Sequence, residues 1–289
     1  MNTFNPCIVT CLNGRSRVSE LVLLCARRLG VPVVAAYTVS ETADYLLLSS
    51  DENVVGIAEL EKNRPGEKWN AALRMAYEHS SEFTHFIIMG DDDVLTNEGF
   101  NYLEQYSRLD YIGFRRNCYY ELSTGRAMIH TNRHENKLIG AGRMISRWAI
   151  RQTCEREIVE ISREGLPGQC MYKGTQYSFP TDCAEYLKGY GYAKDCIGSG
   201  FTGLWPNDKK SGLDHASELL LVVNGFAPVA IDRNHDDIYL IDFKSDKNIW
   251  PYSILEDKCK PYYAHTIIDQ LSDDERRLIL SFLESEMAE

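Results

Sequence analysis

The chain has 289 residues and a hydrophobic share of 44%, a composition typical of soluble globular proteins. Its net charge of −11 by itself argues against a nucleic-acid partner. No apolar run approaches the length of a membrane span, and the first residues lack a secretory pattern, so we expect no membrane attachment. Nine cysteines without a CxxC pair argue against a zinc cluster and favour reduced thiols in a cytoplasm.

Strands and helices alternate along the first 107 residues. Apolar runs predict strands over residues 7–12, 31–38, 53–58 and 85–89. Helical periodicity and turn residues predict helices over 16–29, 40–48 and 65–77, with Ser40 as an N-cap and Pro65 in a first helical turn. This alternation predicts an α/β fold, with a mostly parallel sheet and right-handed crossovers.

Beyond residue 107 the predicted strands become shorter. They cover residues 111–114, 118–122, 127–130 and 229–232, and residues 166–179 are expected to form a loop. Helices are predicted over 146–161, over 213–224 with Gly225 ending it, and over 272–285, where Ser272 and Glu275 form a capping box. We therefore expect a nucleotide-binding half at 1–107, a second half of the same domain at 108–240, and a C-terminal extension at 241–289 that ends in a helix.

Three consecutive aspartates, Asp91, Asp92 and Asp93, follow the apolar run 86–90. Unpaired carboxylates are too costly to bury, so they must lie where the strand leaves the sheet. In an open α/β sheet this is the ligand crevice. Adjacent carboxylates repel one another unless a cation lies between them, and Mg²⁺ or Mn²⁺ fits that role. The competing interpretation is a solvated acidic turn.

The order of these features resembles the GT-A family of metal-dependent glycosyltransferases over roughly residues 6–240. The stretch 86–94 is similar to the strand that ends in that family's DXD motif. Gly212-Leu213-Asp214 is similar to the Glu-Asp that opens the catalytic helix of inverting members, although Leu213 stands where the family often has Glu. Residues 241–244 and 248–250 also resemble bacteriophage-encoded transferases of this fold. The resemblance implies a Rossmann-type, mostly parallel central sheet flanked by helices, with a smaller mixed sheet on the acceptor side.

The same resemblance implies roles for particular residues. Asp93 would be the direct ligand of Mn²⁺ or Mg²⁺, with His235 completing the metal sphere and His215 as its competitor. Asp214 would be the base that takes the proton of an acceptor hydroxyl, and its alternative role is a plain N-cap. The donor would be a nucleotide-sugar, with a UDP-sugar expected. The residues predicted to bind it are Arg15, Asn63, Asp91, Asp92 and Arg143.

The acceptor is predicted from charge. Residues 115–151 hold eight basic and two acidic side chains, although the whole chain is acidic. Such an asymmetry indicates a polyanionic partner, and together with the phage likeness it favours a hydroxymethylated pyrimidine in phage DNA, in a host cytoplasm. Arg133, Lys137 and Arg147 are the residues predicted to bind this acceptor.

Three alternatives remain open. A protein of the same fold could use a glycan, lipid or protein acceptor, which suits the acidic overall charge better. A nucleotidyltransferase also places carboxylates and a metal at a strand end, but usually has a Gly-rich, cationic loop after its first strand, and Asn13-Gly14-Arg15 is a poor match to that. The third alternative is a non-catalytic module that binds a nucleotide-sugar or a metal.

Overall fold

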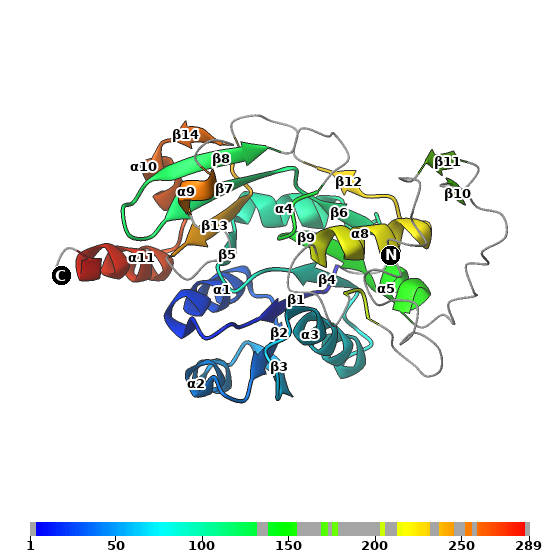
Figure 1. Ribbon diagram of the computed structural model, residues 1–289, viewed down its shortest axis with the longest axis horizontal. Coiled ribbons are helices and arrows are strands. Elements are labelled where there is room, and N and C mark those ends of the chain that lie inside the picture. The colour runs from blue at the N-terminus through cyan, green and yellow to red at the C-terminus, as the bar shows by residue number, and fades with distance from the viewer. Residues whose placement is uncertain are drawn as a thin grey trace.

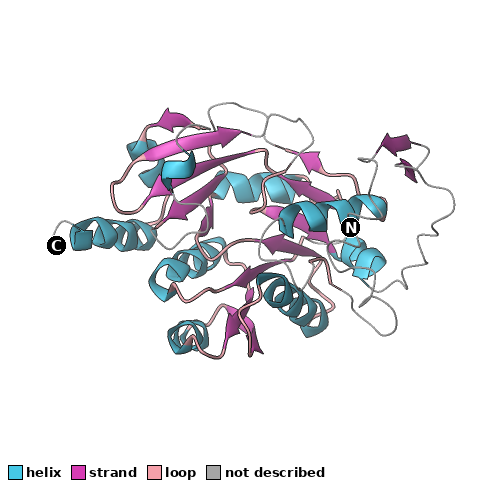
Figure 2. Ribbon diagram, viewed as in Figure 1, coloured by secondary structure: helices cyan, strands magenta, loops and turns pink. Residues whose placement is uncertain are grey.

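The computed structural model describes residues 4–131, 138–154, 169–172, 175–178, 203–205, 213–231, 237–245, 252–255 and 259–286. Two sheets dominate these residues, one of seven strands and one of five, with helices packed around them (Figures 1 and 2). A further short hairpin pairs β10 (Gln169–Tyr172) with β11 (Thr175–Ser178), so the prediction of a loop over 166–179 is wrong for these residues.

The first half of the chain builds most of the large sheet. Its parallel strands are β1 (Pro6–Cys11), β2 (Val33–Thr38), β3 (Val54–Leu60) and β4 (His85–Ile88). The connecting helices are α1 (Ser16–Leu29), α2 (Thr42–Ser50) and α3 (Pro65–His79). These elements confirm the predicted alternation. The N-cap of α2 is Glu41 rather than the predicted Ser40, whereas Pro65 does begin α3.

Three later strands complete the large sheet, in the order β12-β6-β9-β4-β1-β2-β3. They are β6 (Tyr111–Gly113), β9 (Arg143–Ser146) and β12 (Val229–Ala230). β9 was not predicted, and it lies antiparallel between β4 and β6. This half also contains the helices α5 (Arg147–Cys154) and α8 (Leu213–Val223). The predicted helix 146–161 begins as α5, directly after the end of β9.

The five-stranded sheet draws its strands from distant parts of the chain. Its order is β14 (Lys260–Tyr262), β8 (Ala127–Thr131), β7 (Arg116–Glu121), β13 (Leu240–Lys244) and β5 (Asp93–Leu95). Neither β5 nor β13 was predicted as a strand. The remaining helices are α4 (Asn97–Gln105), α9 (Tyr252–Leu255), α10 (Ala264–Ile268) and α11 (Asp273–Glu286).

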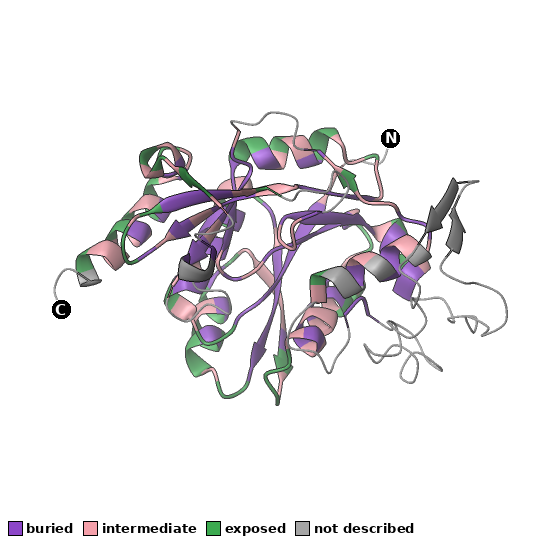
Figure 3. Ribbon diagram, turned by 45° about the horizontal axis from the view of Figure 1, so that its top comes forward, coloured by how far each residue is buried: buried purple, intermediate pink, exposed green. Residues whose placement is uncertain are grey.

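Alternating side chains of the central strands fill two apolar layers, as pleating requires. Ile8 of β1 packs with α1 on one face, and Val9 packs with α3 on the other. The strands are accordingly buried along most of their length, and exposed residues lie mainly on the helices and loops (Figure 3). The expected fold class is confirmed: a Rossmann-type, mostly parallel sheet flanked by helices, with a smaller mixed sheet.

The C-terminal helix is fixed to this core by its predicted capping box. Ser272 donates its hydroxyl to Glu275 Oε2 at 2.8 Å and accepts from the Glu275 backbone N–H. Arg28 of α1 pairs with the same carboxylate at 3.1 Å, and Glu275 is fully buried. Among the described helices, none is long and apolar enough to cross a membrane.

Candidate active site

The large sheet changes direction at β1. The chain runs outward through β2 and β3, then returns so that β4 lies on the other side of β1. Such a switch point is where open α/β sheets bind ligands, at the carboxyl ends of the strands. The two segments that meet there are the turn at residues 13–15 and the aspartates after β4. The fold therefore brings the predicted acidic motif to the position where a ligand crevice is expected.

Asp91 is buried and bound to the turn after β1. Its Oδ2 accepts from the Asn13 backbone N–H at 3.3 Å and from Ser19 Oγ at 3.0 Å. Arg15 forms an ion pair with Asp91 and a second one with Asp92 at 3.1 Å. Although burial raises the pKa of Asp92, the charges of Arg15 and Lys244 outweigh it, so this pKa lies below its usual value. Asp91 and Arg15 thus connect β1 to β4.

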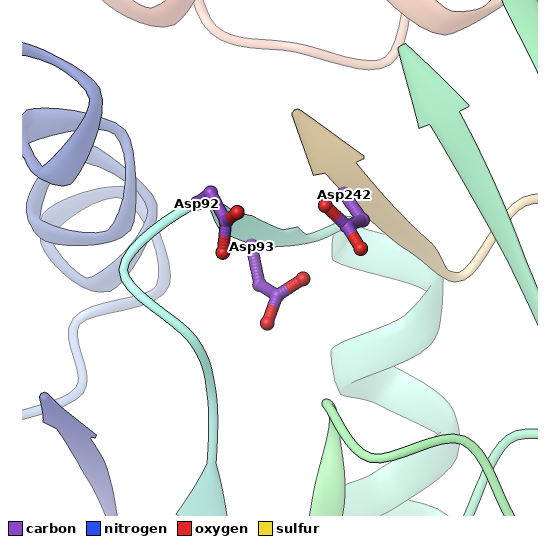
Figure 4. A group of neighbouring side chains, drawn as sticks. All are labelled: Asp92, Asp93 and Asp242. Atoms are coloured by element: carbon purple, nitrogen blue, oxygen red, sulfur yellow. The ribbon is translucent and has the colours of Figure 1, made fainter. Parts of the chain in front are cut away.

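Asp93 faces the second sheet instead. It begins β5, directly opposite Asp242 in the antiparallel register with β13. Asp92, Asp93 and Asp242 each offer a carboxylate oxygen within 4.8 Å of the others (Figure 4). Burial, Asp242 and Asp92 raise the pKa of Asp93 well above its usual value, and burial raises the pKa of Asp242 to about 6. The cluster holds more negative charge than its surroundings favour, so a cation would stabilise it.

The residues in this carboxylate cluster fit a hard divalent ion. Mg²⁺ and Mn²⁺ prefer carboxylate oxygens, and three are available from β5, β13 and the turn before β5. Gly90 makes the close approach possible, because a Cβ there would lie 2.6 Å from Asp93 Oδ2 and 2.9 Å from Asp92 Oδ1. The Gly90 backbone N–H also donates to Asp93 Oδ2 at 2.6 Å.

Asp242 and Lys244 were missed as site residues. In Leu240-Ile241-Asp242-Phe243-Lys244 apolar and charged residues alternate after Ile241, which is the pattern of a strand with one polar face. That signal identifies a half-buried strand, but not its neighbour. Lys244 Nζ lies 2.7 Å from Asp242 Oδ1. Both side chains are largely buried beside the aspartate motif.

Asp214 lies in the first turn of α8 and is exposed. A Cβ at Gly140 would overlap its carboxylate, so Asp214 packs against the loop that precedes β9. The Gly142 N–H in this loop donates to Ile88 O at the carboxyl end of β4 at 2.8 Å. The structure thus places Asp214 at the same edge of the sheet as the aspartate motif. Its role as a base stays a prediction.

Arg143 lies beside the carboxyl end of β4, but its guanidinium is bound within the protein, and its role as a donor ligand stays a prediction. It begins β9, and its buried guanidinium donates to Ile139 O at 2.7 Å and to Asp214 O at 2.8 Å. It also contacts Ser217 Oγ at 3.3 Å and Glu218 at 3.7 Å. Local sequence could not reveal this, because Asp214, Ser217 and Glu218 lie on the distant helix α8. Arg143 fixes the start of α8, and therefore Asp214, against the loop.

Arg147 also differs from its predicted position. Its guanidinium donates to Tyr77 O at 2.6 Å and Ser80 O at 2.9 Å, and lies over the Tyr77 ring. Its backbone N–H bonds Thr84 O, so it lies at the amino end of β4, opposite the aspartates. An acceptor role beside the site does not fit this placement, which instead makes Arg147 a clamp between α5 and α3.

The remaining predicted site residues lie in an exposed loop or outside the part of the chain that the structure describes. Asn63 is exposed in the loop between β3 and α3, and its role with the base and ribose stays a prediction. Arg133, Lys137 and His235 lie outside the described residues. His215 belongs to α8, but its side chain also lies outside the description.

Comparisons with known proteins identify no family. No family model matches the chain, and no curated protein does. Solved structures similar to it include the inositol-1-phosphate CTP transferase from T. maritima, with a TM-score of 0.39, 10% identity and coverage of 97% of this chain and 96% of that one. A putative glucose-1-phosphate thymidylyltransferase from Bacillus anthracis gives 0.36, with 8% identity and coverage of 93% and 96%.

A Drosophila galactosyltransferase, solved with manganese, UDP-Gal and xylobiose, gives a TM-score of 0.32 at 10% identity, and the match covers 53% of this chain and 54% of that one. These neighbours are transferases of two kinds. At such scores the likeness is distant, so function has to be inferred from the residues of the site.

Proposed function

We propose that this protein is a metal-dependent glycosyltransferase that moves a sugar from a nucleotide-sugar, expected to be a UDP-sugar, to a hydroxyl acceptor with inversion. The observation behind this is the cluster of Asp92, Asp93 and Asp242 at the switch point of the large sheet. It combines the ligands of Mg²⁺ or Mn²⁺ with the place where such sheets bind nucleotides.

The charge balance of the site supports a divalent ion. Among the described residues, the ion pairs of aspartates 91, 92, 93 and 242 involve Arg15 and Lys244, so the ionised carboxylates outnumber these cationic partners. Uncompensated charge is costly in a buried site. One divalent ion would neutralise it, and Asp93 with Asp92 and Asp242 would hold that ion.

The proposed reaction breaks the bond between the anomeric carbon and the diphosphate. A bound divalent ion supplies positive charge for the leaving diphosphate. Arg15 holds Asp91 and Asp92 in place through two ion pairs. Asp214, which Arg143 and Gly140 position at the same edge, accepts the proton of the attacking hydroxyl. His235 stays a predicted additional ligand from outside the described residues.

The acceptor is proposed only as a hydroxyl compound. Of the basic residues in 115–151, Arg126 pairs with Glu121, Arg143 is buried, and Arg147 is bound to α3. These contacts do not favour a polyanion at the site. The hydroxymethylated pyrimidine of phage DNA therefore remains a prediction that depends on Arg133 and Lys137, and a glycan, lipid or protein hydroxyl is its alternative.

A second candidate is nucleotidyl transfer, which one observation favours. Lys68 of α3 is fully buried and donates to Leu12 O at 2.6 Å and Asn13 Oδ1 at 2.7 Å, so the turn after β1 has a cation packed against it in addition to its own Arg15. Nucleotidyltransferases use a cationic loop at this point, and the sequence around Asn13 alone did not show one. The two functions differ in the bond that breaks and in the product released.

Product analysis with Mn²⁺ tests both candidates. Incubation with a panel of nucleotide-sugars should release nucleoside diphosphate by slow hydrolysis without an acceptor. Nucleoside triphosphates with sugar phosphates should release no pyrophosphate. Release of pyrophosphate without any hydrolysis of nucleotide-sugars would instead establish the second candidate. An Asp93→Asn variant serves as the control for contaminating enzymes.

A further inference from the structure

Lys244 occupies an unusual place for a lysine. It lies two residues after Asp242 on β13, so both side chains project from the same face of the strand. Its Nζ is 2.7 Å from Asp242 Oδ1 and 5.1 Å from the centre of the Tyr119 ring, and its side chain is only 9% exposed. Tyr119 is the residue opposite Asp242 in the register of β7 and β13. An ammonium group is strongly hydrated, so its burial requires these partners.

The partner of Lys244 also belongs to the carboxylate cluster. Asp242 shares that cluster with Asp92 and Asp93, within 4.8 Å. An ion held by the three aspartates would therefore lie close to the ammonium of Lys244. At short range in a partly dry site two positive charges repel strongly. A divalent ion bound to Asp242 and the ammonium of Lys244 therefore compete for the negative charge of this carboxylate.

We propose, on the basis of the proposed function, that Lys244 is an internal counter-cation that releases Asp242 when metal and donor bind. In the metal-free protein its ammonium neutralises Asp242. When a divalent ion takes that carboxylate, the ammonium pairs with a phosphate oxygen of the donor diphosphate. Lysine suits this exchange because its donors rotate on a flexible stem, and the Tyr119 face supports the cation between its two partners.

This exchange makes the metal and the diphosphate depend on one another. The metal alone has to displace Lys244 without offering it a new partner, so it should bind weakly. The diphosphate supplies that partner, so each ligand should strengthen binding of the other, as reciprocal coupling requires. Part of this coupling belongs to Lys244, and it should disappear when the charge is removed.

The test is a pair of titrations on Lys244→Met. Mn²⁺ alone should bind about tenfold more tightly than to the wild type, because a competing charge is gone. At saturating Mn²⁺, UDP should bind about tenfold more weakly, because a phosphate partner is gone. Lys244→Arg keeps the charge but not the compact ammonium, so it should change each affinity less than Lys244→Met does. The matched control is Lys260→Met, which removes the same charge at an exposed position on β14 and should change neither affinity.

Unchanged or weaker Mn²⁺ binding by Lys244→Met, or unchanged UDP binding, overturns the role of Lys244. If the methionine variant does not fold, Lys244→Gln replaces it with the same expectations. Failure of the proposed function looks different: the wild type would then show no Mn²⁺ binding that Asp93→Asn removes. Mn²⁺ binding that depends on Asp93 but ignores Lys244 refutes the Lys244 exchange alone.

Discussion

Asp91 and Asp93 are two residues apart, yet their carboxylates lie in different surroundings, one beside each sheet. Asp91 points to the β1 side and receives donors from Asn13, Arg15 and Ser19. Asp93 points to the five-stranded sheet, where the Gly90 N–H donates to it and a second carboxylate, Asp242, faces it. A satisfied carboxylate holds a structure together, whereas a crowded one is ready for a cation. Asp91 is therefore the structural anchor of the acidic motif, and Asp93 is its candidate metal ligand.

The largest expected effect comes from the ligand side. Asp93→Asn should lower metal-dependent turnover by about a thousandfold, because it removes charge that holds the ion at the leaving group. Stability should stay near that of the wild type or rise, since a like-charge contact with Asp242 is lost. Donor hydrolysis with Mn²⁺ and a thermal melt measure the two. A variant that keeps its activity, or one that unfolds, would remove the distinction between Asp93 and Asp91.

The next largest effect is expected for a substitution of Asp214. Asp214→Asn should lower transfer about a hundredfold or more while donor affinity is kept, because a base acts mainly in the transition state. The measurement is transfer to acceptor beside UDP binding at saturating Mn²⁺. Asp214 is exposed, so the melting temperature should not move. Transfer within a few-fold of wild type would make Asp214 a simple helix-start residue and remove the support for inversion.

The anchor side should respond in stability. Asp91→Asn leaves Arg15 short of a charged partner in a buried site, and breaking such a pair costs about 3–5 kcal/mol. Denaturant unfolding measures this loss. Asp92→Asn is the matched comparison, because Asp92 also pairs with Arg15 but is less buried, and it should cost less. Equal stability of Asp91→Asn and wild type would show that Asp91 is not an anchor.

The smallest effect is expected at Arg147, and it distinguishes a structural role for this residue from the predicted role in acceptor binding. Arg147→Met removes the hydrogen bonds to the carbonyls of Tyr77, Ser80 and Phe83, which should destabilise the protein by about 2 kcal/mol. Donor hydrolysis should be unchanged. Association with hydroxymethylated DNA, measured against salt concentration, should also be unchanged. A flatter salt dependence would instead support the predicted role of Arg147 in binding the acceptor, together with Arg133 and Lys137.

The sequence by itself determined the elements of the first half of the chain and the strand-end motif. Alternation of apolar runs and helical periods predicted β1–β4 and α1–α3, because these signals are local and each element must bury one face. The chain position of Asp91–Asp93 after a buried strand also followed from local rules, since charges cannot continue into a core. The capping box at Ser272 is of the same kind.

Only the tertiary structure decided which aspartate meets which partner. Asp242 becomes opposite Asp93 because β13 pairs antiparallel with β5, and the alternation along β13 indicates a strand but not which strand lies beside it. Arg143 and Arg147 are similar in sequence context, yet α8 and α3 bury each guanidinium against backbone carbonyls. Charge patterning along the chain cannot anticipate this, because partners are chosen by the packing of segments that are distant in sequence.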